Sequence, residues 1–345
     1  MKLPTFTVVS EMIIYIRYLK DGVSKTDFIS ILPLPGGKAD TITETLGTFL
    51  TEDLGLQLEK MCALGSDGAK VMVGRQNGVA AQLRRRVPHL VNNHCVAHRL
   101  ALAVGQAAKG VPYLQKFKDI IGTSPGPKLK LVEAKDVRWL SHDKATTTLR
   151  KCLPSIYTSL EREAEERNDA RAAGLSVFTQ DYRFVLAIHM ICDVLPHLTA
   201  LSCAMQKRDA VYVTIKPLVN GTISIIQGMK SQSADNYKEA PARGTQLIDD
   251  GFRIKSPSEE QLTAFHEKIY LPFLDNLLQN LEDRFPDLPL LEKFGAFSVG
   301  SSEDDNHQDI QELARHFGVD MEQCRSNWHQ VRASLEGLIS QPTRP

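Results

Sequence analysis

The sequence predicts an α/β protein, with a mixed sheet and its helices in the first third of the chain and a mostly helical remainder. Three observations carry this prediction. Between residues 11 and 109, strand and helix patterns follow one another in the order β, β, α, β, α, β, α, which fits a mixed sheet with helices packed on it. The segment 122–127, GTSPGP, opposes regular structure through its glycines and prolines. Beyond it, apolar residues recur mostly at three- to four-residue spacing, which indicates helices.

The first two elements are predicted to be the strands of a hairpin. Residues 11–19 are rich in Ile and Tyr, which favour strands. Residues 26–34 form a second β-like run, and an Asp-Gly pair, Asp21-Gly22, lies between the two runs. That dipeptide is typical of a tight hairpin turn, so the two runs should pair with each other.

Helices and short strands are predicted to alternate after the hairpin. Residues 41–54 carry apolar residues at helical spacing, and Gly55 suits the end of a helix. The next elements have the composition of two short strands and two helices; they are a strand at 61–65, a helix at 76–86, a strand at 89–95 and a helix at 96–109.

The remainder of the chain is predicted to be helical, with one long loop. Four segments show helical apolar spacing, namely 144–166, 181–207, 212–229 and 259–285. Residues 231–257 are polar and rich in Gly and Pro, so we expect a long mobile loop there. Two short helices, 309–317 and 321–339, should flank Gly318. We therefore expect two domains, residues 1–122 and 123–345.

Composition limits the possible partners. The chain has 345 residues, 42% of them hydrophobic, and Lys+Arg and Asp+Glu both number 41. A neutral chain has no overall positive field to hold nucleic acid, so any such binding must be local. The six cysteines are scattered and indicate a reducing, intracellular compartment. No apolar run reaches the roughly 18 residues that cross a bilayer, so we expect no membrane partner.

The first candidate site is the aspartate in Gly65-Ser66-Asp67-Gly68. Asp67 follows a predicted strand, and a carboxylate at the rim of a sheet can join other acids around Mg²⁺, which prefers oxygen ligands. A two-metal site for phosphoryl transfer needs at least two or three such groups. An Asp between glycines also suits a turn or a helix cap.

The second candidate is the stretch His94-Cys95-Val96-Ala97-His98-Arg99. Two imidazoles and a thiol could be zinc ligands, but a structural zinc site wants four, and no second pair lies at the usual spacing. A packed junction between strand and helix is the alternative, and we expect no bound metal.

The third candidate set is basic and aromatic. Arg138 beside Trp139 could stack on an unpaired base or grip a phosphate, although a tryptophan also suits a core. The triplet Arg84-Arg85-Arg86 could contact phosphate, and three positive charges at the end of a helix also suit its dipole.

Several familiar catalytic motifs are not found in the sequence. It contains no glycine-rich phosphate loop ending in Lys-Ser/Thr, no Gly-x-Ser-x-Gly elbow and no His-Glu-x-x-His pair.

Taken in order, the three candidate motifs resemble the hAT transposase family. They resemble most closely the vertebrate zinc-finger and related proteins that carry a hAT-derived remnant. The matching residues are Ser66-Asp67-Gly68-Ala69 with Gly74, then His94-Cys95, His98-Arg99 and Ala101-Leu102, then Arg138-Trp139-Leu140-Ser141. The motifs cover roughly residues 10–229.

The resemblance implies a fold and a chemistry. The family has a ribonuclease-H-like α/β core interrupted by a large helical insertion. This implies a partial core at residues 1–122 and an insertion-type domain at 123–345. Three acids, two Asp and one Glu, bind divalent metal in the family, and Asp67 corresponds to the second aspartate.

The sequence departs from the family pattern in ways that count against catalysis. The place of the first aspartate, residues 3–11, holds no aspartate, and Glu11 falls after the position. We also expect the closing glutamate and the family's dimerisation segment to be absent. The connection at 121–128 is shorter than in relatives. The resemblance is therefore to an incomplete family member, and it leaves the oligomeric state open.

We therefore expect a catalytically inactive nuclear protein, not an enzyme, that contacts nuclear proteins, chromatin or DNA and needs no cofactor. Three alternatives stay open. One is a non-catalytic nucleic-acid-binding module that uses the arginine triplet, Arg138 and Trp139. Another is a residual Mg²⁺-dependent nuclease or transposase, with Glu11 or Asp136 completing a site around Asp67. The last is a fragment that folds poorly.

Overall fold

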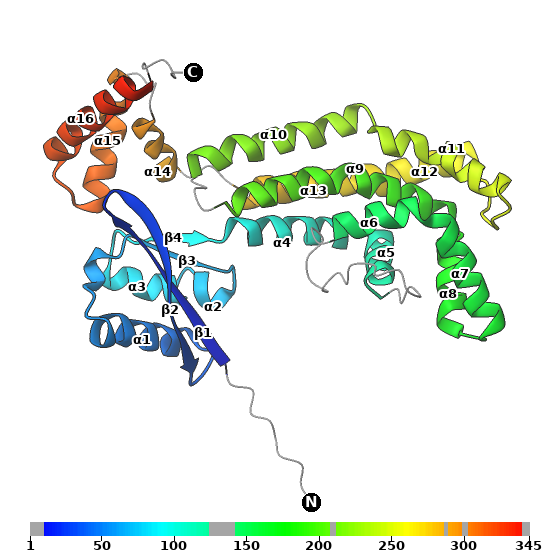
Figure 1. Ribbon diagram of the computed structural model, residues 1–345, viewed down its shortest axis with the longest axis horizontal. Helices are drawn as coiled ribbons and strands as arrows, with labels where there is room; N and C mark the ends of the chain where they lie inside the picture. The colour runs from blue at the N-terminus through cyan, green and yellow to red at the C-terminus, as the bar shows by residue number, and fades with distance from the viewer. Residues whose placement is uncertain (1–9, 124–141, 208–211, 286–288, 299–302, 340–345) are drawn as a thin grey trace, which may run out of the picture. The chain divides into compact units, whose positions relative to one another are not determined.

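The computed structural model describes residues 10–123, 142–207, 212–285, 289–298 and 303–339. The fold is mixed α/β and mostly helical, with two small sheets in the described residues (Figure 1). The chain forms two compact units. Unit 1 combines the residues up to Cys95 with those from Ile310 onward, and unit 2 is Val96–Asp309.

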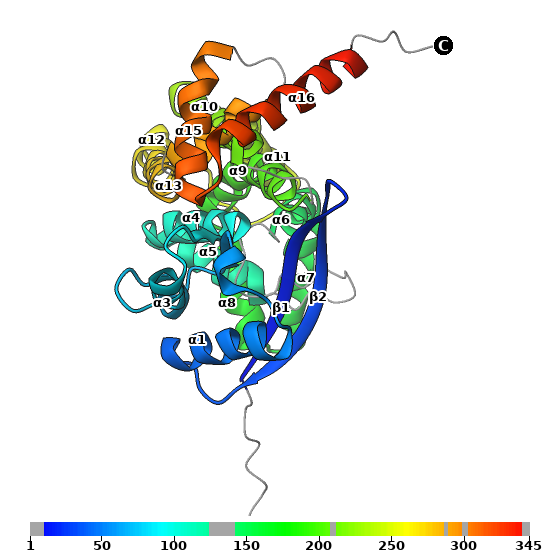
Figure 2. The same cartoon turned by 90° about the vertical axis from the view of Figure 1, so that its left-hand side faces the viewer.

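The hairpin predicted at the start of the chain is confirmed. Strands β1 (Ser10–Lys20) and β2 (Val23–Leu34) pair antiparallel and lie side by side in both views (Figures 1 and 2). Asp21 and Gly22 form the two-residue turn with φ of 53° and 74°. Positive φ at both positions suits the right-handed twist of a hairpin, and it explains the Asp-Gly pair.

The expected single mixed sheet is not what the described residues form. Strands β3 (Ala63–Ser66) and β4 (Val91–His94) make a separate parallel pair of four residues each. No strand in the described part of the chain joins this pair to the hairpin, so the two ladders stay apart. The predicted strands at 61–65 and 89–95 are confirmed as elements.

Short helices close the core of unit 1. They are α1 (Ala39–Thr48) with a π-helical extension (Phe49–Asp53), a 3-10 turn (Leu58–Lys60), α2 (Lys70–Val73) and α3 (Val79–Arg86). Gly55 follows the first helix with a φ of +63°, as expected for a glycine at a helix end. Val79 and Leu83 of α3 are fully buried in this core, beside Ile14 of the hairpin.

Unit 1 also contains the two helices predicted around Gly318. They are α15 (Glu303–Phe317), which begins in unit 2, and α16 (Met321–Ile339). Gly318 has a φ of +65° and ends the first of them. The ring of Phe317 contacts His89, and His316 Nε2 lies 3.1 Å from the backbone oxygen of the same histidine.

Unit 2 is helical. Its elements are α4 (Val96–Lys109), α5 (Pro112–Thr123), α6 (His142–Lys151), α7 (Leu153–Glu166), α8 (Ala170–Thr179), α9 (Tyr182–Met205), α10 (Tyr212–Ser231), α11 (Asp235–Asp249), α12 (Glu259–Phe265), a π turn (His266–Tyr270), α13 (Leu271–Arg284), α14 (Pro289–Glu292) and a 3-10 turn (Lys293–Phe297). The helices predicted at 144–166, 181–207, 212–229 and 259–285 are therefore confirmed, two of them in more than one piece.

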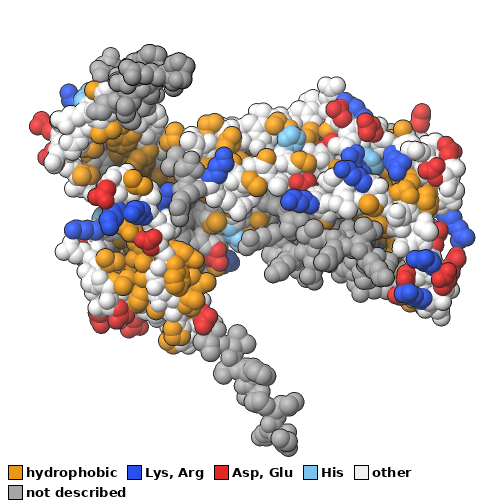
Figure 3. Space-filling model, viewed as in Figure 1, with side chains coloured by type: hydrophobic (Ala, Val, Ile, Leu, Met, Phe, Trp, Pro, Cys, Tyr) orange, Lys and Arg blue, Asp and Glu red, His pale blue; other side chains and the backbone are white. Residues whose placement is uncertain are grey.

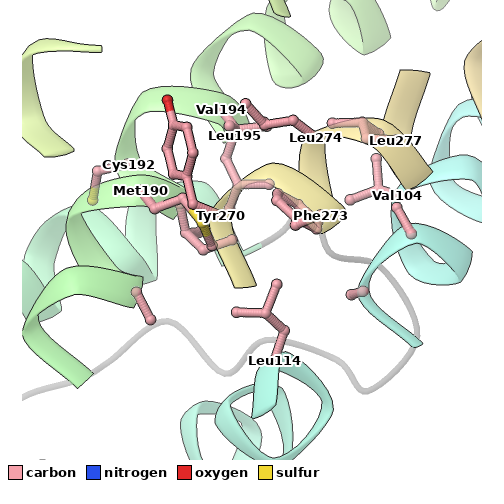
Figure 4. Packing of buried hydrophobic residues seen from close by; sticks show 14 of the residues in the cluster. Val104, Leu114, Met190, Cys192, Val194, Leu195, Tyr270, Phe273, Leu274 and Leu277 are labelled. Carbon is pink, nitrogen blue, oxygen red and sulfur yellow. The ribbon is translucent and has the colours of Figure 1, made fainter. Parts of the chain in front are cut away.

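Helix α4 moves the unit boundary away from residue 122, where the sequence analysis placed it. Leu100, Ala103 and Val104 of α4 are fully buried in the core of unit 2. Small side chains on this helix let it pack closely on α13, where Figure 4 shows Val104 near Leu277. The predicted division at 122/123 is therefore wrong, and the chain divides after Cys95.

Helix α9 is the centre of unit 2. It is long and apolar enough to cross a membrane by length and composition, but 78% of its most apolar window is buried inside the protein. Leu195 on this helix packs with Phe273 and Leu274 of α13, as Figure 4 shows. An apolar helix surrounded by other helices is the expected core of a helical domain.

The long mobile loop predicted at 231–257 is wrong in its central part, which forms α11. Tyr237, Ala240 and Leu247 are buried at helical spacing and pack against unit 2's core. The sequence signal was hidden because Pro241 and Gly244, both helix-breaking residues, lie inside the helix. Tertiary packing outweighs their poor propensity here.

Candidate functional site

Asp67 lies directly after β3 and is exposed. Its Oδ1 accepts a hydrogen bond from the backbone N–H of Ala69 at 3.1 Å, and the Ser66 hydroxyl donates to the backbone oxygen of Asp67 at 3.0 Å. An aspartate side chain that accepts a hydrogen bond from the backbone N–H two residues later forms an Asx turn, which reverses the chain locally. The geometry therefore matches the turn alternative raised for this residue.

Two of the three family-like motifs meet at the carboxyl ends of β3 and β4. Ser66 of β3 is paired with His94 of β4, and the backbone N–H of Cys95 donates to the backbone oxygen of Ser66 at 2.8 Å. A Cβ added to Gly68 would lie 2.3 Å from Cε1 of His94, so the imidazole occupies the space that a side chain would need. Gly68 is thus required by the close approach of its neighbour's ring.

Asp67 is the one carboxylate that the turn after β3 supplies. A two-metal site for phosphoryl transfer needs several carboxylates that converge on the ions. In the residues that the structure describes, no group of three or more His, Cys, Asp or Glu side chains could hold a metal ion. Asp67 provides a single exposed carboxylate that also serves a turn. Glu11, considered as a completing acid, lies exposed at the start of β1, and Asp136 is outside the described residues.

The histidine motif is divided between the two units. His94 and Cys95 belong to unit 1, whereas His98 and Arg99 lie in the first turn of α4 in unit 2. Arg99 donates from Nη1 to the backbone oxygen of Arg284 at 3.2 Å, at the end of α13. Arg99 therefore helps to fix α4 to α13, which is a structural role.

The arginine triplet ends α3 and is exposed. Arg84 Nε donates to the backbone oxygen of Leu90 at 3.0 Å, and Arg85 Nη2 donates to the backbone oxygen of Gln76 at 2.9 Å. Two of the three guanidinium groups thus tie neighbouring loops to the helix. Arg138 and Trp139, the other predicted nucleic-acid-binding residues, lie outside the described residues.

A surface that the sequence analysis did not single out lies on the hairpin. The alternating side chains of β1 and β2 make two faces, and one of them is exposed; we call it the open face. Its cross-strand pairs are Glu11 with Pro33, Ile13 with Ile31, Tyr15 with Phe28, Arg17 with Thr26, and Leu19 with Ser24. Figure 3 shows hydrophobic side chains gathered over the hairpin.

The apolar side chains of the open face are strongly exposed. The exposed fractions are 59% for Ile13, 62% for Tyr15, 75% for Leu19, 55% for Phe28 and 48% for Ile31. Monomeric proteins rarely expose contiguous apolar patches without a function. The opposite face of the same ribbon is covered near Ile14, which is buried in the core of unit 1, with Met12 and Ile16 partly buried on either side of it.

A β-bulge builds the open face. The register shifts between Ile14 and Tyr15, so that Ile29 has no cross-strand partner. Phe28 and Ile31 are three residues apart and would point to opposite faces of a regular strand. The extra residue places both on the open face. The sequence signal for this face is the run Ile13-Ile14-Tyr15-Ile16, which is apolar at both parities, whereas a half-exposed strand alternates with polar residues.

A second missed feature is a buried carboxylate in unit 2. Asp193 on α9 is 9% exposed and accepts hydrogen bonds from the backbone N–H of Asn236 at 3.2 Å, its side-chain amide at 2.7 Å and the backbone N–H of Tyr237 at 2.9 Å. The Arg150 guanidinium donates to the Asn236 side-chain oxygen. The carboxylate therefore caps the positive end of α11 and fixes this helix to α9.

No family model matches this chain, and no solved structure matches it.

Proposed function

We propose that this chain is a catalytically inactive, hAT-transposase-like nuclear protein that works by binding other protein chains. The observation that carries the proposal is the open face of the hairpin. Clustered large apolar side chains with charged residues beside them, here Glu11 and Arg17, are typical of protein interfaces. The motif resemblance supplies the family and the nuclear location.

The Asp67 region supports the inactive half of the proposal. Its carboxylate accepts a backbone hydrogen bond within a local turn, and no cluster of possible metal ligands surrounds it among the described residues. In-line phosphoryl transfer requires converging acids around metal ions. A bound Mg²⁺ is expected only under the alternative that the chain is a residual nuclease.

The test of inactivity is a DNA-nicking assay with Mg²⁺ or Mn²⁺. Folded wild-type chain should nick supercoiled DNA no faster than Asp67→Asn does. Asp53→Asn, which changes another exposed acid of unit 1, is the matched control. Metal-dependent nicking that disappears only in Asp67→Asn would overturn the proposal and support a nuclease.

Nucleic-acid binding without catalysis is the second candidate, and the exposed arginine triplet favours it. A chain that binds DNA through these residues would lose affinity steeply with rising salt. The expected result for the proposed protein-binding function is weak DNA binding that replacement of Arg86 by Ala leaves unchanged. Arg84 and Arg85 are poorer test positions because they also hold loops.

A further inference from the structure

The open face carries one acidic and one basic side chain, which lie far apart along β1. Glu11 lies near the start of β1, whereas Arg17 lies six residues further along the same side of the strand. At about 3.3 Å per residue, their backbones are roughly 20 Å apart, so the two side chains cannot pair within one chain. Tyr15 and Ile13 lie between them.

This pattern is complementary to itself. When two such ribbons meet face to face and run antiparallel, a twofold axis between Ile13 and Tyr15 places Glu11 of each copy opposite Arg17 of the other. The same axis places the pair of Tyr15 and Phe28 against Ile13 and Ile31 of the second copy. An isologous contact uses each pairing twice, so a small surface makes two ion pairs around one apolar centre.

We propose that a second copy of this chain covers the open face, through antiparallel packing of the two hairpins. The proposal rests on the protein-binding function proposed above and names the partner. In this register the four apolar side chains of the central pairs face their counterparts, and at about half exposed each they provide on the order of 400 Å² per copy; they are Ile13, Tyr15, Phe28 and Ile31. The dimer therefore buries about 800 Å² of apolar surface in total, to which the flanking polar side chains add, so the interface is small and the dissociation constant should be micromolar or weaker.

Sedimentation equilibrium of the full chain over a concentration series tests the dimer. The wild-type mass should rise from one chain towards two between low and high micromolar concentration. Tyr15→Lys, at the centre of the open face, should raise the dissociation constant at least tenfold. Val177→Lys is the matched control, since Val177 on α8 is 74% exposed and lies in unit 2. A chain that stays monomeric, or a dimer that Tyr15→Lys leaves unchanged, overturns the proposal.

Charge reversal tests the antiparallel arrangement. Glu11→Arg places two positive charges face to face across the dimer, and Arg17→Glu places two negative charges face to face. Each single variant should therefore dimerise at least tenfold more weakly. An equimolar mixture of the two variants should dimerise as well as wild type, because each copy then meets the opposite charge. Failure of the mixture to recover would contradict the proposed register.

Two checks keep these outcomes separate from folding and from the proposed function. Both charged residues are exposed, and Arg17 donates a hydrogen bond to the Ser24 hydroxyl, so circular dichroism should match that of wild type, and thermal melts should be close to it at concentrations where every chain is a monomer. A variant that does not match is replaced by Glu11→Gln or Arg17→Gln, which removes the charge without reversing it. The nicking assay gives an independent answer: a monomer without nicking rejects only the dimer, whereas nicking rejects the inactive-protein proposal itself.

Discussion

The hairpin of unit 1 and helix α9 of unit 2 share one property of sequence and differ in its outcome. Residues 13–16 of β1 and most of α9 are apolar on all sides. Helix α9 is enclosed by its neighbours, and its Leu195 and Ile188 are fully buried. Strand β1 is covered on one side at Ile14 and exposed on the other at Tyr15. A strand or helix that is apolar on all sides is expected to be covered on all sides. Of these two elements, only α9 is covered in this way within the described chain. The uncovered side is where we propose that a partner binds.

The largest expected effect comes from a matched pair of phenylalanines in the two regions. Phe273→Ala removes a ring that is 0% exposed in unit 2 and should lower the free energy of unfolding by about 3–5 kcal/mol. Phe28→Ala on the open face should change the free energy of unfolding of the monomer by less than about 1 kcal/mol. Urea unfolding at low protein concentration measures both, and equal losses would show that the open face is part of a core.

The buried carboxylate should come next in size. Asp193→Ala leaves the N–H groups of Asn236 and Tyr237 without their acceptor, so unfolding should cost about 2–4 kcal/mol less. Asp235→Ala is the control at the same end of α11, because its side chain is 97% exposed. Hydrogen exchange of α11 should accelerate only in the first variant. Unchanged protection would mean that packing alone holds the helix.

Close packing at the family-like motifs predicts a smaller loss. Gly68→Ala places a Cβ within the His94 ring and should destabilise unit 1 by about 1–3 kcal/mol. Gly65→Ala is the control, since nothing lies within 4 Å of its Cβ position. The double variant Gly68→Ala with His94→Ala should recover part of the loss. A loss that is equal in both glycine variants would assign the effect to backbone flexibility.

The smallest effect is a pH dependence in unit 2. Burial lowers the pKa of His189 below its ordinary 6.5, and the positive charges of Arg150 and Arg243 add to this. The folded imidazole therefore stays neutral while the unfolded one takes up a proton. Its contribution to stability is complete above pH 6.5 and is lost as the pH falls from 6.5 towards the lowered pKa, by at most about 1.4 kcal/mol per pH unit.

Unfolding of His189→Gln over the same pH range checks this dependence. The variant should show a flatter decline below pH 6.5 than wild type. His197→Gln, at a less buried position of the same helix, is the control for replacing a histidine by glutamine. If both variants decline equally, the pH dependence comes from other groups.

The sequence predicted the elements better than their assembly. The Asp21-Gly22 turn and the glycine after α15 were readable because each local signal has one physical cause, a backbone with positive φ. Whether β1 and β3 share a sheet depends on long-range pairing, which no local pattern encodes. The unit boundary after Cys95 likewise depends on where α4 is buried.

The candidate site was predictable only in part. The adjacency of Gly68 and His94 follows from parallel strands whose ends meet; the sequence singled out both motifs but did not predict that they lie together. The role of Asp193 could not be foreseen, because its partners lie more than forty residues away in a segment whose Pro241 and Gly244 predicted a loop. The open face was visible as an apolar run on both parities of β1, but the sequence does not say which side stays uncovered.

Hydroxyl-radical footprinting of the chain at low concentration tests the central comparison most directly. Tyr15 and Phe28 should react at the rates of exposed rings, whereas Tyr270 and Phe273, which are 1% and 0% exposed, should be protected. Raising the concentration should then protect the first pair and leave Val177 unchanged. Tyr15 and Phe28 already protected in the monomer would contradict the account, because another part of the same chain would then cover the open face.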